Sequence, residues 1–215
     1  MFIFGEDPVR TDPNTHHVIK SLESLDFFAI DELFMTETAK LADVILPGRS
    51  YAEKEGTFSN TERRVQRVRK AVEIEGDTKP DTWIFTEIMR RMGYPQPHLT
   101  PAQIMDEIAS VTPSFAGISH ERLDSEEVNG QGLQWPCTTP IMHVGKFARG
   151  LGYFRPAAYT PSMELPDEEY PLIMMTGRIL YHYNACAMTD KTEGINKIAG
   201  ESIIEINTED ANALG

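Results

Sequence analysis

The chain has 215 residues, of which 40% are hydrophobic and 25% are charged, and its formal net charge is −13. This composition is ordinary for a globular protein of one large or two smaller domains, and the negative charge argues against non-specific nucleic-acid binding, which needs a broad basic surface. No run approaches the ~20 apolar residues of a membrane span, and two cysteines, Cys137 and Cys186, support neither a disulfide framework nor a zinc or iron–sulfur site of this chain.

Both ends of the chain resemble interrupted elements. The N-terminal MFIFGEDP starts abruptly as a strand and lacks the basic segment of a signal peptide, so we predict a cytoplasmic protein. The C-terminal TEDANALG stops where a helix is still expected to continue. We therefore expect the chain to be a piece of a longer protein.

The first 48 residues alternate short apolar runs with stretches of helical spacing. The runs Phe2–Phe4, Phe27–Ile30 and Val44–Leu46 predict three buried strands. Pro13–Leu25 predicts a helix between the first two strands, and Glu37–Ala42 predicts a shorter helix between the last two. Because crossovers of this kind are right-handed, the pattern predicts a parallel sheet covered by helices, in a Rossmann-like α/β domain.

Local chemistry supports both of these helices. Asp12 followed by Pro13 is typical of a cap and a first helical position, and Thr36 can cap the shorter helix. Pro47 and Gly48 then stop the third strand.

Acidic side chains follow the first two predicted strands directly. Asp7 comes just after the first strand, and Asp31 and Glu32 come just after the second. Open α/β sheets bind ligands at the carboxyl ends of their parallel strands, so we favour a ligand role for Asp7 and Asp31. The alternative is that the carboxylates only cap helices, which suits Asp12 better.

A polar, glycine-bearing stretch from Ser50 to Asn60 predicts a loop that presents a ligand-binding surface. Five basic residues follow closely: Arg63, Arg64, Arg67, Arg69 and Lys70. They form a local exception to the acidic composition. The alternative is a solvated strand or loop edge whose charges pair with the many carboxylates, and the sequence leaves both interpretations open.

Two helices are predicted in the middle of the chain. The first begins at Pro80 and ends at Gly93, and the second begins at Pro101. Thr100 and Gln103 are placed to form a capping box for the second helix. We expect three methionines of these helices to lie in the core: Met89, Met92 and Met105.

The last hundred residues have a different texture. Residues 114–165 show no sustained period, which is typical of a functional connection or a domain junction. Leu172–Met175 and Ile203–Ile206 predict two buried strands, and Asn207 can cap a final helix that begins near Thr208. We infer a second domain after about residue 150.

Six segments resemble a known family. GEDP (5–8), DELFMTETAKLADVILPG (31–48), EKEGTFSNTERRVQ (53–66) and KPDTW (79–83) are similar to segments of the molybdopterin oxidoreductases. Within that family, TGRILYHYN (176–184) and EINTEDANALG (205–215) resemble the catalytic subunit of formate dehydrogenase. The resemblance runs over nearly the whole chain and is loosest at residues 114–150.

The resemblance implies a cofactor and a domain plan. It implies a bis(molybdopterin guanine dinucleotide) cofactor that holds molybdenum or tungsten, and a 4Fe-4S cluster in an N-terminal part that precedes this chain. Residues 1–150 would belong to the third of four domains, an α/β domain. Residues 151–215 would start the fourth, a molybdopterin dinucleotide-binding β-barrel.

The resemblance also implies what this chain does not contain. Neither Cys137 nor Cys186 matches the cysteine or selenocysteine that ligates the metal, and the catalytic histidine of the family lies upstream. We therefore assign no catalytic residue and no metal ligand. We expect the 215-residue chain alone to be inactive and to purify without molybdenum, tungsten or iron.

Eight positions match cofactor-binding residues of the family. Those that match its nucleotide contacts are Asp7, Thr11, Asp31, Glu32 and Asp81. Those that match residues lying against the pterin and its phosphates are Arg178, His182 and Asn184. Guanine presents two neighbouring N–H donor groups that one carboxylate can accept, and arginine offers a planar fork to an anion. For His182 the alternative is a core histidine with a hydrogen-bonded ring.

By this resemblance the chain is part of a formate dehydrogenase, which oxidises formate to carbon dioxide and removes two electrons. The implied partners are the remainder of the catalytic subunit and iron–sulfur or flavin subunits that carry electrons. Two alternatives stay open: a fragment of assimilatory nitrate reductase, which shares the E-x-x-G-T-x-x-N-x-E-R-R pattern, and a non-catalytic scaffold of the same fold.

Overall fold

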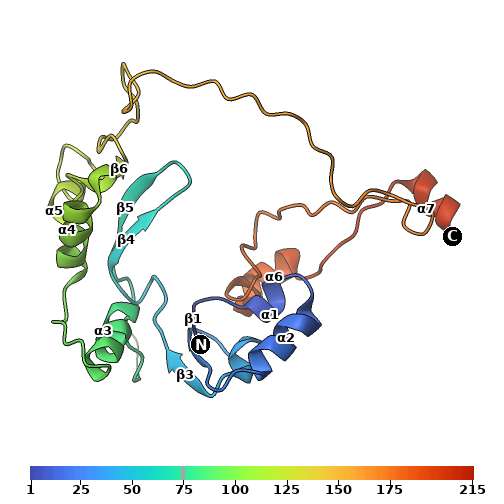
Figure 1. The fold of residues 1–215 in the computed structure, drawn as a ribbon, viewed down its shortest axis with the longest axis horizontal. Coiled ribbons are helices and arrows are strands. Elements are labelled where there is room, and N and C mark those ends of the chain that lie inside the picture. The colour runs from blue at the N-terminus through green and yellow to red at the C-terminus, as the bar shows by residue number, and fades with distance from the viewer. Residues whose placement is uncertain (74–75) are drawn as a thin grey trace. The chain divides into compact units, whose positions relative to one another are not determined.

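The structure is a computed structural model that describes residues 1–73 and 76–215. The chain divides into two compact units (Figure 1). Unit 1 comprises residues 1–45 and 160–215, and unit 2 comprises residues 46–159. The two domains implied by the family resemblance, 1–150 and 151–215, have other boundaries than these units, and they stay a prediction.

A small parallel sheet organises the N-terminal part of unit 1. Strand β1 (Phe2–Phe4) pairs in parallel with β2 (Ala29–Glu32), and Ile3 lies opposite Ile30. Strand β3 (Val44–Pro47) completes the order β1-β2-β3. All three predicted strands are therefore present, and the first two have the predicted parallel direction.

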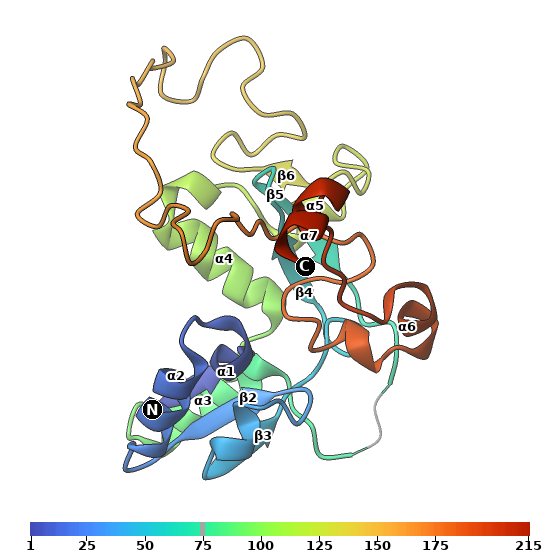
Figure 2. The same ribbon diagram turned by 90° about the vertical axis from the view of Figure 1, so that its right-hand side faces the viewer.

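Two helices pack against this sheet (Figure 2). Helix α1 spans Pro8–Thr11 and α2 spans Thr15–Glu23. Their apolar side chains form one core with those of the strands and of the 3-10 turn η1 (Ala39–Leu41). The buried members are Ile3, Val9, Leu22, Phe28, Ile30 and Ala39.

The predicted helix over Pro13–Leu25 begins later than expected. Asp12 is not its cap: Asp12 ends α1 as the C-cap residue, and α2 begins only at Thr15. Asn14 caps α2 instead from a left-handed conformation, which asparagine tolerates, and its side chain accepts from the backbone N–H of His17 at 3.4 Å. The predicted helix Glu37–Ala42 is only the turn η1, although Thr36 Oγ1 accepts from Ala39 N–H at 3.1 Å as a cap would.

Only the central strand of this sheet is buried over most of its length, from Ala29 to Asp31. Ile30 is fully buried, whereas Phe4 is 45% exposed in β1 and Val44 is 40% exposed in β3. The prediction of three buried strands was wrong for β1 and β3, because both are edge strands of a sheet of three. In β1 only Ile3 is buried, and in β3 no residue is.

Unit 2 is built on an antiparallel sheet. Strands β4 (Gly56–Ser59) and β5 (Arg64–Val68) form a hairpin, and β6 (Leu133–Gln134) pairs with β5. Of the segment Ser50 to Asn60, predicted as a ligand-presenting loop, residues 56–59 form β4 and the residues before them form turns, so the ligand role stays a prediction. Gly132 permits the third strand to approach, because a Cβ there would lie 2.5 Å from the Val65 carbonyl oxygen.

Helices α3 (Asp81–Arg91), α4 (Pro101–Val111) and α5 (His120–Leu123) accompany this sheet, with a 3-10 turn η2 at Pro113–Phe115. The capping box predicted for α4 is confirmed, with both Thr100 and Gln103 contacts present. The core of unit 2 contains Val65, Met105, Ile118, Leu123, Val128 and Leu133.

The predicted burial of the methionines holds for one of the three residues. Met105 is 3% exposed and lies in the core, whereas Met92 is 81% exposed. Met92 is the C-cap residue that follows the last turn of α3, so the predicted burial was wrong for this residue. Met89 is half-buried.

The C-terminal part of unit 1 lacks the predicted strands. Leu172–Met175 and Ile203–Ile206 are irregular and exposed, and within the described residues neither run pairs with another segment. The regular elements of this part are the 3-10 turn η3 (Thr189–Lys191), helix α6 (Glu193–Ala199) and helix α7 (Thr208–Leu214), which lie outside the two runs. Asn207 caps α7 as predicted, by accepting from Glu209 N–H at 2.8 Å.

No closed barrel is seen in residues 151–215, so the partial β-barrel stays a prediction. In the described part of the chain, no helix has the length and apolar character that crossing a membrane requires.

Candidate functional site

Acidic residues meet at the carboxyl ends of β1 and β2, as predicted. Asp31 lies opposite Phe4 in the parallel register, and the Asp31 carbonyl accepts from Gly5 N–H at 2.9 Å. Burial raises the pKa of Glu32, and the charges of Asp7 and Glu6 raise it further, against hydrogen bonds from the backbone N–H groups that follow. These carboxylates are therefore electrostatic neighbours at one edge of the sheet.

Asp7 is held by internal hydrogen bonds. Its side chain is buried, and its Oδ1 accepts from Thr38 N–H at 3.0 Å and from Thr38 Oγ1 at 2.6 Å. The same hydroxyl accepts from Val9 N–H at 3.0 Å, so the network ties α1 to the turn η1. Asp7 Oδ1 therefore has internal partners, and the ligand role of Asp7 stays a prediction.

The other strand-end residues differ in their access to solvent. Asp31 is 2% exposed, Glu32 is half-buried, and Thr11 is exposed on α1. Thr11 Oγ1 donates to the Asp7 carbonyl at 3.1 Å. Glu32 and Thr11 are consequently the members of this group that a ligand can reach most easily.

The C-terminal segment of unit 1 is anchored beside α1. Arg10 of α1 forms an ion pair with Asp190 at 3.2 Å. Burial acts to raise the pKa of Asp190, but hydrogen bonds from Arg10 and Lys191 outweigh it and lower the pKa. Residues from the two ends of the chain therefore meet in one unit.

The three predicted pterin-facing residues lie in this segment. His182 is half-buried, and its ring nitrogens contact Thr189 Oγ1 at 2.7 Å and the Ala199 carbonyl at 2.6 Å. A neutral ring that donates from Nε2 and accepts at Nδ1 satisfies both contacts. Both ring nitrogens of His182 thus have partners within the segment, and its place against the pterin stays a prediction. Arg178 and Asn184 are exposed, and Asn184 has a left-handed backbone at φ 49°.

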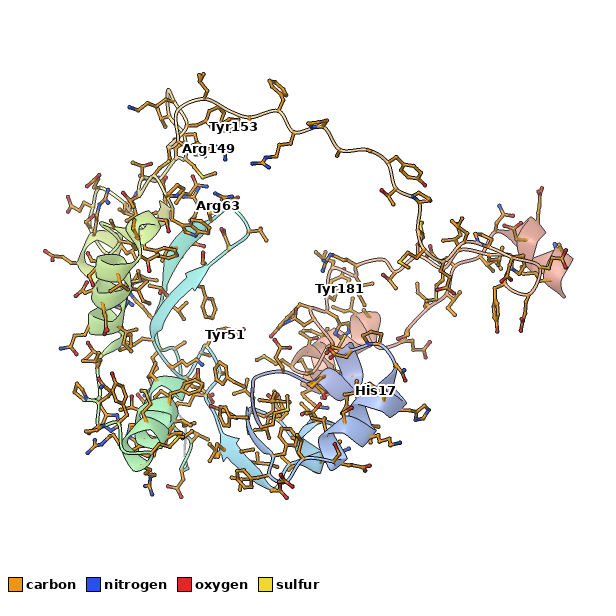
Figure 3. All side chains as sticks on the ribbon, viewed as in Figure 1. His17, Tyr51, Arg63, Arg149, Tyr153 and Tyr181 are labelled. Carbon is orange, nitrogen blue, oxygen red and sulfur yellow. The ribbon has the colours of Figure 1, made fainter. Side chains whose placement is uncertain are left out.

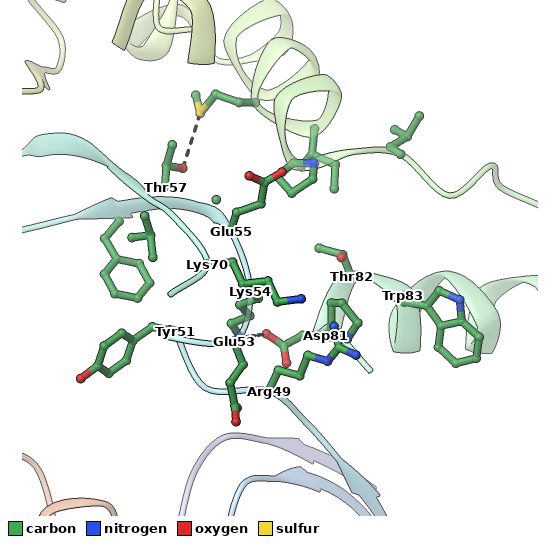
Figure 4. A pocket seen from close by; sticks show the side chains of 18 of the residues that line it. Arg49, Tyr51, Glu53, Lys54, Glu55, Thr57, Lys70, Asp81, Thr82 and Trp83 are labelled. Atoms are coloured by element: carbon green, nitrogen blue, oxygen red, sulfur yellow. Dashed lines mark hydrogen bonds and ion pairs between the residues drawn. The ribbon is translucent and has the colours of Figure 1, made fainter. Parts of the chain in front are cut away.

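Asp81 lies in unit 2, in a pocket of about 660 Å³ (Figure 4). It is the first residue of α3, and its carboxylate forms an ion pair with Lys54. Charged and aromatic side chains share the walls, among them Arg49, Tyr51, Lys54, Phe58, Asp81 and Trp83. The pocket therefore offers both apolar surface and a few polar groups, which is the usual character of a small-molecule site.

The sequence analysis missed Lys54 and Arg49. Arg49 donates to the Thr78 carbonyl at 3.0 Å and so joins the loop before β4 to the approach to α3. The available signal was that EKEG (53–56) and KPDTW (79–83) both resemble family segments. That resemblance alone does not say that the two segments meet.

The basic segment turns out to be largely paired. Arg67 and Arg69 both bind Asp124, Arg64 binds Glu62, and Lys70 binds Glu73. Arg63, in the turn between β4 and β5 (Figure 3), lies over the Trp135 ring at 4.8 Å. Four of the five basic residues therefore pair with carboxylates, as the alternative interpretation expects, but the Arg64 and Arg67 side chains are only 19% and 11% exposed.

Across the described ranges, no three histidine, cysteine, aspartate or glutamate side chains are grouped so that they can hold a metal ion.

Comparison with known proteins finds the family that the sequence motifs indicated. Residues 1–91 match the sequence profile of the family described as Molybdopterin oxidoreductase. The chain is 49% identical over 225 residues to the F420-dependent formate dehydrogenase 2 subunit alpha of Methanococcus maripaludis, with 100% of this chain and 32% of that protein covered. It is 42% identical over 224 residues to the F420-dependent formate dehydrogenase subunit alpha of Methanocaldococcus jannaschii, with the same two shares.

Among solved structures, acetylene hydratase from Pelobacter acetylenicus gives a TM-score of 0.46 at 22% identity, over 64% of this chain and 21% of that chain. The chain spans about a third of the length of the two curated relatives, 32% in each case. The resemblance to molybdopterin oxidoreductases, and among them to formate dehydrogenase alpha subunits, is confirmed.

Proposed function

We propose that the chain is part of the catalytic subunit of a cytoplasmic formate dehydrogenase, and that it binds the nucleotide portion of a molybdopterin cofactor. The observation that carries the proposal is the 49% identity to a formate dehydrogenase alpha subunit over the whole chain. The placement of acidic residues at the strand ends and in a pocket is in keeping with it. Assimilatory nitrate reductase and a non-catalytic scaffold are the weaker alternatives, because the named relatives are formate dehydrogenases.

The reaction is the conversion of formate to carbon dioxide, a proton and two electrons. A bis(molybdopterin guanine dinucleotide) group with molybdenum or tungsten would supply the redox chemistry, and a 4Fe-4S cluster elsewhere in the subunit would receive the electrons. This chain would contribute binding and orientation. The relatives are named F420-dependent, which supports F420 as the electron acceptor of the whole enzyme.

The donor and acceptor chemistry of the strand ends fits the nucleotide portion of this group. Guanine offers neighbouring N–H donors, and a carboxylate is an acceptor with about four lone-pair sites. Glu32 is half-buried among negative charges that raise its pKa, so incoming donors would relieve an unfavourable environment. Buried Asp7 would support this edge through Thr38, while Thr11 and buried Asp31 complete it.

The remaining residues divide into direct and indirect contacts. Asp81 would accept from a guanine in the pocket of unit 2. Exposed Arg178 would bind a phosphate, because its planar guanidinium offers two parallel N–H donors. Asn184 would donate to the pterin or its phosphates. His182 would act by holding the segment in shape, since both of its ring nitrogens are engaged.

Nucleotide discrimination by the 215-residue chain tests the proposal. We expect GDP to bind weakly, since a few hydrogen bonds of ~1–3 kcal/mol each must offset the loss of freedom on binding. We expect ADP to bind about tenfold more weakly, because adenine places an acceptor where guanine places N1–H. Titration calorimetry with both nucleotides measures the ratio.

The variants Asp81→Asn and Asp26→Asn form a matched pair, because Asp26 is an exposed residue of unit 1 that does not line the pocket. Asp81→Asn should abolish the preference for GDP, and Asp26→Asn should retain it. Equal binding of the two nucleotides by the wild type, or an Asp81→Asn protein that still prefers GDP, would count against the assignment.

A further inference from the structure

We propose that Lys54 is a positioning residue for guanine recognition. Its ammonium group holds the Asp81 carboxylate in the orientation that accepts the N–H donors of the purine. The inference rests on the proposed function of the pocket and adds to it the residue that sets its specificity. Lys54 lies in the loop that leads into β4, and Asp81 is the first residue of α3, 27 positions later.

The ion pair is more than a contact on an open surface. The Lys54 and Asp81 side chains are only 27% and 17% exposed. In such surroundings the ammonium interacts with the carboxylate more strongly than a fully solvated pair would, because fewer water molecules screen the two charges. Both side chains line the pocket, and Figure 4 shows the ammonium directed at the carboxylate.

The geometry leaves the carboxylate able to accept a ligand. Lys54 contacts Oδ2 of Asp81. A carboxylate has about four lone-pair sites, so one lysine contact leaves sites on both oxygens for two parallel N–H donors. The lysine therefore fixes the rotation of the carboxylate and need not be displaced when guanine binds.

Other cations near the pocket do not share this role. The Arg49 guanidinium donates to the Thr78 carbonyl and hydroxyl, at 3.0 and 3.4 Å. Lys70 pairs with Glu73, whose side chain is 86% exposed. Among the ion pairs of the described residues, Lys54 is the partner that Asp81 has. Lys70 thus supplies a matched control, a second lysine that lines the same pocket and pairs with Glu73 instead of Asp81.

The experiment compares Lys54→Met, Lys54→Arg and Lys70→Met in the 215-residue chain. The probes are GDP, ADP and guanosine, which lacks phosphate. We expect Lys54→Met to reduce the preference for GDP over ADP about tenfold and to weaken guanosine binding by the same factor. Lys54→Arg should restore most of the preference, and Lys70→Met should leave it unchanged. The melting temperature of Lys54→Met should stay within about 3 °C of the wild type, since a partly exposed pair adds little stability.

The outcomes separate this inference from the proposed function. A wild type that does not prefer GDP overturns both. If the wild type prefers GDP, Asp81→Asn loses the preference and Lys54→Met keeps it, then the pocket assignment stands and the role of Lys54 is refuted. A Lys54→Met variant that binds GDP more weakly but guanosine normally also refutes it, because Lys54 would then contact phosphate and not position Asp81.

Discussion

Two parts of unit 1 carry similar sequence patterns and adopt different structures. Near the N-terminus, the apolar runs around Ile3 and Ile30 form the parallel strands β1 and β2. Toward the C-terminus, Leu172–Met175 and Ile203–Ile206 are equally apolar, yet they are irregular and exposed. Hydrophobicity therefore selects candidate strands, and pairing decides which of them form.

The difference lies in what each run meets. Helices α1 and α2 return the chain from β1 to β2, and their apolar side chains join the same core. Within the described residues, no segment pairs with the two C-terminal runs. A strand needs a neighbour for its backbone N–H and C=O groups, because unpaired groups in a buried strand cost free energy. The contrast predicts very different responses to mutation.

Truncation of one isoleucine in each part should show the largest effect. Ile30 is 0% exposed and Ile204 is 93% exposed. We expect Ile30→Ala to lower the free energy of unfolding by about 2–5 kcal/mol, and Ile204→Ala to change it by less than about 0.5 kcal/mol. Urea denaturation followed by circular dichroism measures both. Similar losses from the two variants would show that the C-terminal run is packed.

A threonine pair extends the comparison to polar groups. Thr38 is 0% exposed and its hydroxyl lies between Asp7 and Val9, whereas Thr192 is an exposed residue at the start of α6 that makes no side-chain capping bond. Thr38→Val should cost about 1–3 kcal/mol, because it leaves Asp7 and the Val9 N–H short of a buried partner. Thr192→Val should stay within about 0.5 kcal/mol.

The same denaturation experiment measures these two variants. Thr38→Ser is the control, because serine keeps the hydroxyl and should recover most of the loss. A Thr38→Val protein as stable as the wild type would mean that the Asp7 network contributes little to folding.

What could be predicted from the sequence was mostly local. The capping box of Thr100 and Gln103, the Asn207 cap and the chain order of three strands in the first 48 residues depend on residues close in the chain or on simple crossovers. The placement of Asp7 and Asp31 at one sheet edge followed from that order. By contrast, the hairpin β4–β5 was hidden by polar side chains, although its buried Val65 packs on distant Leu133.

Non-local partners account for the rest of the misses. Lys54 escaped notice because its partner Asp81 is 27 residues away. The charges of Arg67 and Arg69 are balanced by Asp124, more than fifty positions later. Periodicity and capping rules describe a residue's neighbours in sequence, so they identify elements and do not identify the contacts between them. The family resemblance identified Asp81 as a candidate site residue, but it did not identify Lys54 as the partner of Asp81.

The smallest expected effect is a pH dependence of the free energy of unfolding. It arises at the ends of β1 and β2, where the carboxylates of Glu6, Asp7 and Glu32 repel one another. Burial, followed by the charges of Asp7 and Glu6, raises the pKa of Glu32 above its ordinary 4.5. A group whose pKa is raised on folding stabilises the protein fully below its unfolded-state pKa, and that contribution is lost as the pH rises through the folded-state pKa. Glu32 is therefore most favourable when protonated and becomes a cost near neutral pH.

Replacement by a neutral side chain of the same shape should remove that cost. Glu32→Gln keeps the oxygen that accepts from Leu33 N–H, a bond of 2.7 Å in the wild type. At about pH 4 the variant and the wild type should be equally stable, and as the pH rises the variant should become more stable, by less than about 1 kcal/mol because the side chain is partly solvated. Glu23→Gln removes the same charge from the exposed face of α2, and urea denaturation at each pH should show no comparable gain. The opposite result is a Glu32→Gln variant that loses stability relative to the wild type as the pH rises. It would mean that the folded protein stabilises the ionised carboxylate of Glu32. The strand-end carboxylates would then not repel one another as their positions imply.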